Sequence, residues 1–117
     1  MCFIIDDEHP KIKIAKKDII CYKRFNATDS VKEIFISTYQ NCRYYIGEIK
    51  ESEIIFSGFH IIDIGLHSYS TLKTAKEKKW NKSEFLAKCI IPKDSKYYYN
   101  SYDHEYVSNQ LKVIEKI

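Results

Sequence analysis

The sequence predicts a single α+β domain, residues 1–117, built mainly on an antiparallel sheet with one short helix at about residues 70–80. Segments rich in β-branched and aromatic residues recur along the chain, most clearly at residues 19–25, 85–91 and 110–117. Most neighbouring strand segments are joined without a helix between them, which favours antiparallel pairing. A chain of 117 residues fits one domain.

The predicted elements follow in chain order from composition and turn signals. Strands are predicted at residues 2–5, 19–25, 85–91, 96–99 and 110–117, and strand or loop at 43–49. Residues 54–62 contain an apolar stretch with a glycine break, and polar or loop segments are predicted at 6–17, 26–30 and 100–108. The helix is predicted at residues 71–80, because Leu72 and Ala75 share a face and either Ser68 or Ser70 can cap it. Gly65, just before it, predicts a turn that a Cβ would disfavour.

Residues 31–42 leave two interpretations open. Their apolar side chains fall at helical spacing, from Val31 to Cys42. Residues 34–39, however, are dense in types that prefer strands. We favour extended structure from residue 34 onward.

The charge and cysteine content limit the classes of function. The net charge is +3, with nine basic and nine acidic residues in 1–58 and ten and seven in 59–117. This falls short of the basic domain expected of a dedicated nucleic-acid binder. Cys2, Cys21, Cys42 and Cys89 match no zinc motif, so we expect reduced thiols and neither metal nor cofactor. With no signal peptide and apolar runs of about four residues, we expect a cytoplasmic protein without a membrane partner.

The first candidate site surrounds the predicted start of the helix and comprises His60, His67, Ser68, Tyr69 and Ser70. Free N–H groups at a helix N-terminus can hold an anion, and the helix dipole would lower the pKa of His67. The structural alternative is that Ser70 caps the helix, Tyr69 packs and His67 makes one hydrogen bond. Whether His67 lines a pocket is left open.

Two further segments could form a recognition surface. Lys73, Lys76, Lys79 and Lys82, with Trp80 among them, could contact phosphates and stack a base, although a solvated helix face is the simpler interpretation. In the tract containing Tyr97, Tyr98 and Tyr102, alternation along a strand would expose about half of the tyrosines.

Five short segments occur together in a distinctive order: Ile36-Ser37-Thr38-Tyr39-Gln40, Tyr45-Ile46-Gly47-Glu48, Gly65-Leu66-His67-Ser68-Tyr69, residues 88–98 and Leu111-Lys112-Val113-Ile114-Glu115. This order resembles small uncharacterised proteins encoded by bacteriophages and by gut and environmental bacteria. The resemblance covers most of the chain from Ile19 to the end. It implies no assigned activity and no catalytic residues.

Tyr22-Lys23-Arg24, Ser37-Thr38 and Glu115 follow one another along the chain. This order is similar to that of the ADP-ribosyltransferase fold. Those enzymes carry an Arg or His on an early strand, a Ser-Thr-Ser-type strand and a late catalytic Glu. The motif is incomplete, because Ser37-Thr38 lacks the third residue.

These patterns favour a small non-enzymatic binding or accessory protein, derived from a phage or mobile element. It would bind a protein partner through a surface of Tyr69, Trp80 and residues 97–102. The chain has no nucleophile elbow and no paired carboxylates in an apolar setting. The alternatives are a nucleotide-handling enzyme that uses His67 and a weak nucleic-acid binder that uses the Lys73–Lys82 helix.

Overall fold

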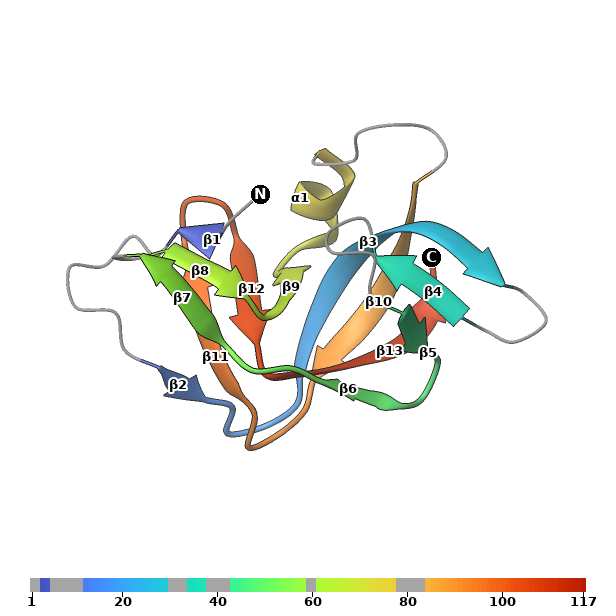
Figure 1. The fold of residues 1–117 in the computed structure, drawn as a ribbon. Coiled ribbons are helices and arrows are strands. Elements are labelled where there is room, and N and C mark those ends of the chain that lie inside the picture. The colour runs from blue at the N-terminus through green and yellow to red at the C-terminus, as the bar shows by residue number, and fades with distance from the viewer. Residues whose placement is uncertain (1–2, 5–11, 30–33, 38–42, 59–60, 78–83) are drawn as a thin grey trace.

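The computed structural model describes residues 3–4, 12–29, 34–37, 43–58, 61–77 and 84–117 (Figure 1). Within these residues one short helix accompanies many strands. The elements are β1 (Phe3–Ile4), β2 (Lys13–Ile14), β3 (Ile19–Asp29), β4 (Ile34–Ser37), β5 (Arg43–Tyr45), β6 (Ile49–Glu51), β7 (Ile55–Gly58), β8 (Ile61–Ile64), β9 (Leu66–Tyr69), α1 (Leu72–Glu77), β10 (Phe85–Ile91), β11 (Lys96–Asn100), β12 (Glu105–Ser108) and β13 (Gln110–Lys116).

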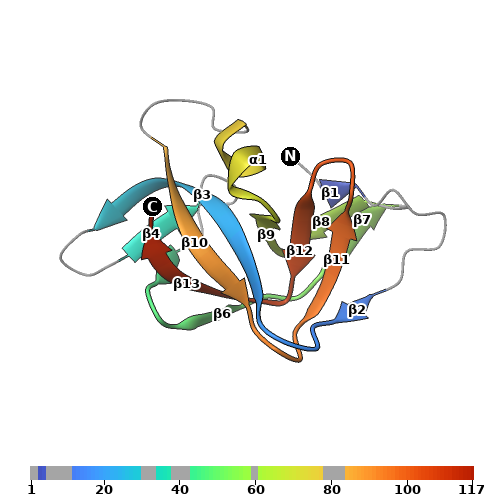
Figure 2. The ribbon, with the colours of Figure 1, turned by 180° about the vertical axis from the view of Figure 1, so that it is seen from behind.

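Ten of the strands form one large sheet, which Figure 2 shows from behind. Eight follow the order β2-β11-β12-β9-β3-β10-β13-β6, while β4 pairs with β3 and β5 pairs with β4. A smaller sheet has the order β1-β8-β7. Every described strand pair is antiparallel. Long strands such as β3 and β10 are explained by their β-branched and aromatic residues, which fit a pleated, half-buried surface.

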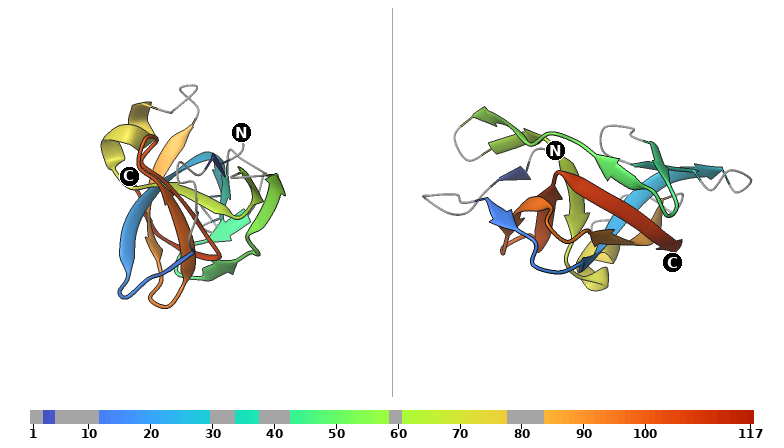
Figure 3. Two further views of the ribbon diagram at one scale, coloured as in Figure 1. Left: turned by 90° about the vertical axis from the view of Figure 1, so that its left-hand side faces the viewer. Right: turned by 90° about the horizontal axis from the view of Figure 1, so that it is seen from below.

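The large sheet curls back on itself around the main core, as the two views of Figure 3 show. Just after β5, the Gly47 amide donates a hydrogen bond to the Val113 carbonyl of β13, at 2.9 Å. The ring of Phe25 lies 5.5 Å from that of Tyr44, edge to face, and 5.7 Å from that of Phe85. We call the side of the sheet that carries this cluster the inner face.

The outer face of the sheet is covered in two places. Over β3, β9 and β10, helix α1 packs Ala75 against Tyr69 and Leu86. Over β11 and β12, the small sheet packs Ile62 against Val107. Because side chains alternate along each strand, β9, β10 and β12 bury residues on both faces.

The prediction of a mainly antiparallel sheet with one short helix is confirmed. The α+β label fits only loosely, because the described helix has six residues. It begins after Thr71, whose hydroxyl accepts a hydrogen bond from the Thr74 amide at 3.2 Å. The cap is therefore Thr71 rather than Ser68 or Ser70. Residues 78–80 of the predicted helix lie outside the described residues.

Four local predictions were wrong. Residues 26–29, predicted as a loop, continue strand β3, and the segment 6–17, predicted as polar, contains strand β2. The segment around His67 is strand β9, not a turn that leads into a helix. Residues 105–108, predicted as part of a polar excursion, form strand β12 between β9 and β11. The extended structure favoured from residue 34 is confirmed over β4, and residues 38–42 lie outside the described part of the chain.

Gly65 has a different role from the predicted one. It lies at the bend where the chain leaves the small sheet at β8 and enters the large sheet at β9. A Cβ at this position would overlap Cγ2 of Val107, which is fully buried. Glycine is required here by close packing between strands and not by a left-handed backbone. No helix in the described parts of the chain is long and apolar enough to span a membrane.

Candidate functional site: a basic pocket lined by tyrosines

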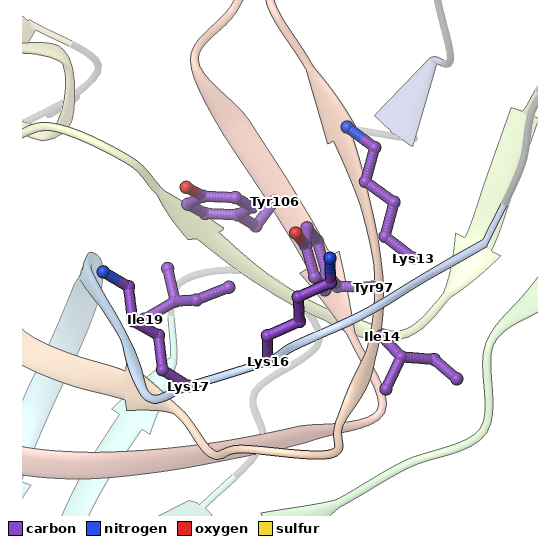
Figure 4. Close-up of a pocket in the computed structure, with 7 residues that line it drawn as sticks. All are labelled: Lys13, Ile14, Lys16, Lys17, Ile19, Tyr97 and Tyr106. Atoms are coloured by element: carbon purple, nitrogen blue, oxygen red, sulfur yellow. The ribbon is translucent and has the colours of Figure 1, made fainter.

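A cavity of about 500 Å³ opens beside strand β2, at the edge of the large sheet. Its lining combines cationic, aromatic and apolar side chains: Lys13, Ile14, Lys16, Lys17, Ile19, Tyr97 and Tyr106. We call it the basic tyrosine pocket. Figure 4 shows the three lysine side chains rising from one short segment toward the side of the two rings, while Ile14 points away. Its volume lies within the range of ligand sites, about 300–1,000 Å³.

The two tyrosines reach the pocket from paired strands. Tyr97 lies on β11 and Tyr106 on β12, and their ring centroids are 5.7 Å apart in an edge-to-face arrangement. Both rings pack partly against the main core on the inner face, so one side of each is supported by the protein. Both are half-buried. Packing fixes their positions while leaving part of each ring open to a ligand.

The lysine segment is held by backbone hydrogen bonds. Strand β2 pairs with β11, and Lys13 lies opposite Tyr97. The amide of buried Ala15 donates to the Ser95 carbonyl at 2.9 Å, and the Ala15 carbonyl accepts from the Asp94 amide at 2.8 Å. Asp18 closes the segment by accepting a hydrogen bond from the Lys93 amide at 2.9 Å. The lysines therefore project from a fixed backbone.

The electrostatics of the pocket favour an anion. Lys13, Lys16 and Lys17 are exposed. The ion pairs found among the described residues are Arg24–Glu84 and His67–Glu105, and neither includes a pocket lysine. Burial, followed by the nearby Tyr99, raises the pKa of Tyr106, so its hydroxyl stays protonated and can donate a hydrogen bond at neutral pH.

A third tyrosine extends the aromatic lining along the β11–β12 hairpin. The Tyr99 and Tyr106 ring centroids are 4.9 Å apart, with the planes tilted by 42°. The hydroxyl of Tyr99 lies 3.3 Å from Nδ1 of His104 in the turn. Tyr97, Tyr106 and Tyr99 thus form a continuous row that starts in the pocket, and we call it the tyrosine row.

Of the predicted cluster, His67, Ser68 and Tyr69 are buried, and none of the three lines either cavity found among the described residues. Nδ1 of His67 lies 3.1 Å from Oε1 of Glu105. Burial lowers the pKa of His67, and the hydrogen bond to Glu105 opposes that shift. Lys23, also buried, donates a hydrogen bond to the His67 carbonyl. The neighbouring Ser68 is buried on β9 as well.

The prediction that Tyr69 belongs to an exposed aromatic surface was wrong, and the structural alternative, in which Tyr69 packs, is confirmed. Its side chain is only 8% exposed and packs under α1. The Arg24 guanidinium lies over its ring, at 5.6 Å from the centroid. Ser70 is half-buried, and its amide donates to the His104 carbonyl at 2.8 Å. The structure therefore does not bring Tyr69 together with residues 97–102 on one surface.

The remaining predicted residues are separated by the sheet. Tyr97 lines the pocket, but Tyr98 points to the outer face, where its ring centroid lies 5.5 Å from that of Phe56. Tyr102 is 83% exposed in the β11–β12 turn. Lys73 and Lys76 are exposed on α1. His60, Lys79, Trp80 and Lys82 lie outside the described residues.

The residues of the ADP-ribosyltransferase similarity lie on three strands. Arg24 is on β3 and lies 3.9 Å from the carboxylate of buried Glu84. Ser37 is in β4, and Glu115 is exposed in β13. In the sheet, strand β10 therefore separates the strand that carries Arg24 from the strand that carries Glu115.

Sequence reasoning found Tyr97 but missed Lys13, Lys16, Lys17 and Tyr106. The lysines belong to a segment that was interpreted only as polar and charged, and the equal numbers of basic and acidic residues in 1–58 gave no indication of a basic surface. A signal was present: lysine alternates with Ile12, Ile14 and Ala15 over residues 11–17, which is typical of an edge strand with a basic side.

A second hollow, of about 450 Å³, has the opposite character. It is lined by Glu51, Ser52, Glu53, Asn109 and Gln110, at the β6–β13 edge. The Gln110 side-chain amide donates to Oε1 of Glu51 at 3.2 Å. The two hollows therefore separate basic from acidic side chains at different edges of the sheet.

Comparisons with family models, with curated proteins and with solved structures find no match to this chain. The resemblance to phage and bacterial proteins therefore stays a prediction.

Proposed function

We propose that this protein is a non-enzymatic binding protein that holds an anionic ligand with a flat aromatic part in the basic tyrosine pocket. The observation that carries the proposal is that three lysines and two tyrosines line one cavity of about 500 Å³. A ligand of this kind uses both features, since its charge meets the lysines and its ring packs on a tyrosine.

The charges supply attraction and the rings supply selectivity. Each lysine ammonium carries three donors and is mobile at the end of its side chain, so it adapts to phosphate or carboxylate oxygens. Exposed charges contribute modestly, each about 1 kcal/mol or less in salt. Stacking of a base on an aromatic side chain contributes about 1–3 kcal/mol. A ligand that has only the charge or only the ring should therefore bind much more weakly.

A matched ligand set tests this division of roles. Adenosine 5′-monophosphate has both parts, ribose 5-phosphate lacks the ring system, and adenosine lacks the charge. We expect isothermal titration at low salt to rank the monophosphate first. Binding by none of these compounds, or equal binding by all three, would contradict the proposal.

Variants locate the binding on the protein. The double variant Lys16→Gln/Lys17→Gln removes two pocket charges, and Lys73→Gln/Lys76→Gln removes two exposed charges from α1 as a matched control. Tyr97→Leu removes one pocket ring, and Tyr45→Leu removes an exposed ring from β5. We expect the pocket variants to weaken binding and the controls to retain it. Equal losses in both lysine pairs would mean that net charge, and not this pocket, attracts the ligand.

A further inference from the structure

The basic tyrosine pocket is continuous with the tyrosine row, and a small ligand in the pocket would leave the far end of that row uncovered. Tyr97 and Tyr106 face the pocket, and Tyr99 continues the row on the far side of Tyr106, at 4.9 Å between ring centroids. Tyr97 and Tyr99 are two residues apart on β11, roughly 7 Å along the strand. All three rings are half-buried on the inner face. A cavity of about 500 Å³ accommodates one nucleotide-sized group, and Tyr99 lies outside its lining.

The charges of the site lie at one end of this row. Lys13 pairs with Tyr97 across β2 and β11, and Lys16 and Lys17 follow in the next turn of the chain. The half-buried ring of Tyr99 lies at the other end, and its hydroxyl is 3.3 Å from Nδ1 of His104. Proteins that bind single-stranded nucleic acid with little sequence preference combine positive charge with a series of aromatic side chains on which the bases stack.

We propose that the ligand is a single-stranded nucleic acid, with one nucleotide in the basic tyrosine pocket and the adjoining bases stacked along the tyrosine row. This inference rests on the proposed function and adds the ligand class. A duplex keeps its bases stacked inside the helix, so it could use only the lysines. An acidic peptide could pair with the lysines but would place no series of flat rings against Tyr106 and Tyr99.

The test measures the fluorescence anisotropy of a labelled oligothymidylate of about eight nucleotides, within the usual site size. We expect it to bind at least about tenfold more tightly than thymidine monophosphate measured by competition. Three lysine–phosphate contacts predict a slope near −2 for log affinity against log salt, since each contact contributes about −0.7 for single strands. Affinity should then fall about 20-fold between roughly 50 and 200 mM salt.

The variant Tyr99→Leu distinguishes the contribution of the tyrosine row to binding from that of the pocket. It should weaken oligothymidylate binding about fivefold or more and leave the mononucleotide unchanged, because only the longer ligand reaches Tyr99. Tyr99→Phe keeps the ring and should retain oligothymidylate affinity. Melting temperatures of both variants show whether a loss of binding reflects a loss of folding. If Tyr99→Leu does not fold, the wild-type comparison of oligomer with monomer decides.

Each contrary outcome has a distinct meaning. This inference is overturned if the mononucleotide binds as tightly as the oligothymidylate, or if Tyr99→Leu does not weaken oligothymidylate binding. The proposed function stands in both cases. Equal affinity for a duplex, or for an oligoglutamate peptide, also overturns the inference. Binding of no anion at low salt removes both the inference and the proposed function.

Discussion

The contact between Gly65 and Val107 makes a quantitative prediction about how the two sheets are joined. A Cβ at Gly65 would overlap Cγ2 of Val107, and Val107 is fully buried against Ile62 and Tyr98. Valine is stiff at χ1, so the methyl cannot swing aside freely. Overpacking of this kind costs about 1–3 kcal/mol, and Gly65→Ala should lower the free energy of unfolding by that amount.

The double variant isolates the overlap. Val107→Ala alone removes two buried carbons and should cost about 1–3 kcal/mol. In Gly65→Ala/Val107→Ala, the new methyl occupies space that the valine leaves. We therefore expect the double variant to be about as stable as Val107→Ala alone, which gives a coupling energy of about 1–3 kcal/mol between the two positions.

Urea denaturation of the four proteins measures this cycle, provided that the m-value stays constant. Gly47→Ala is the matched control. Gly47 has φ +83° and nothing within 4 Å of its missing Cβ, so that substitution costs backbone energy and Val107→Ala should not relieve it. Gly65 and Val107 do not overlap as described if the free-energy effects of the two single substitutions add to within about 0.5 kcal/mol in the double variant.

Three other predictions follow from buried groups. Burial raises the pKa of Cys21 to about 12 and that of Cys89 well above its ordinary value. Iodoacetamide at pH 8 should therefore label both thiols only after denaturation, which peptide mass spectrometry measures. Rapid labelling of the native protein would contradict this. Burial lowers the pKa of His67 below its ordinary 6.5, so protons bind the unfolded state preferentially and stability should fall as pH drops from about 7 toward the folded-state pKa. His67→Gln should flatten that fall in urea titrations, and an unchanged pH profile would count against the assignment. Thr71→Ala removes the cap of α1 and should cost about 1 kcal/mol in the same assay, whereas Ser70→Ala should cost less.

The strands that the sequence predicted well are those whose own residues determine them. Strand β10 has the predicted limits because Phe85–Ile91 is a continuous run of strand-forming residues that stops at Pro92. The predicted strand at 110–117 corresponds to β13 for the same reason. Strands β9 and β12 were missed because their residues are polar or ambiguous. They become strands through pairing with each other, such as Val107 with His67.

The candidate site was predictable only in part. A tyrosine-rich strand at residues 96–99 indicated a recognition surface, and Tyr97 does line the pocket. Its partners Lys13 and Lys16 are about eighty residues away in the sequence, and only the pairing of β2 with β11 brings them together. Tyr69 was assigned to the surface because a single sequence does not reveal that α1 packs over it.

The central claim is that the basic tyrosine pocket and the tyrosine row form the binding site. Amide chemical-shift changes in ¹⁵N-labelled protein, titrated with oligothymidylate at low salt, test it most directly. The account predicts that the largest changes fall at residues 13–19 and at Tyr97, Tyr99 and Tyr106. Changes centred on α1 or on the acidic hollow at Glu51 and Gln110, or none at all, would contradict it.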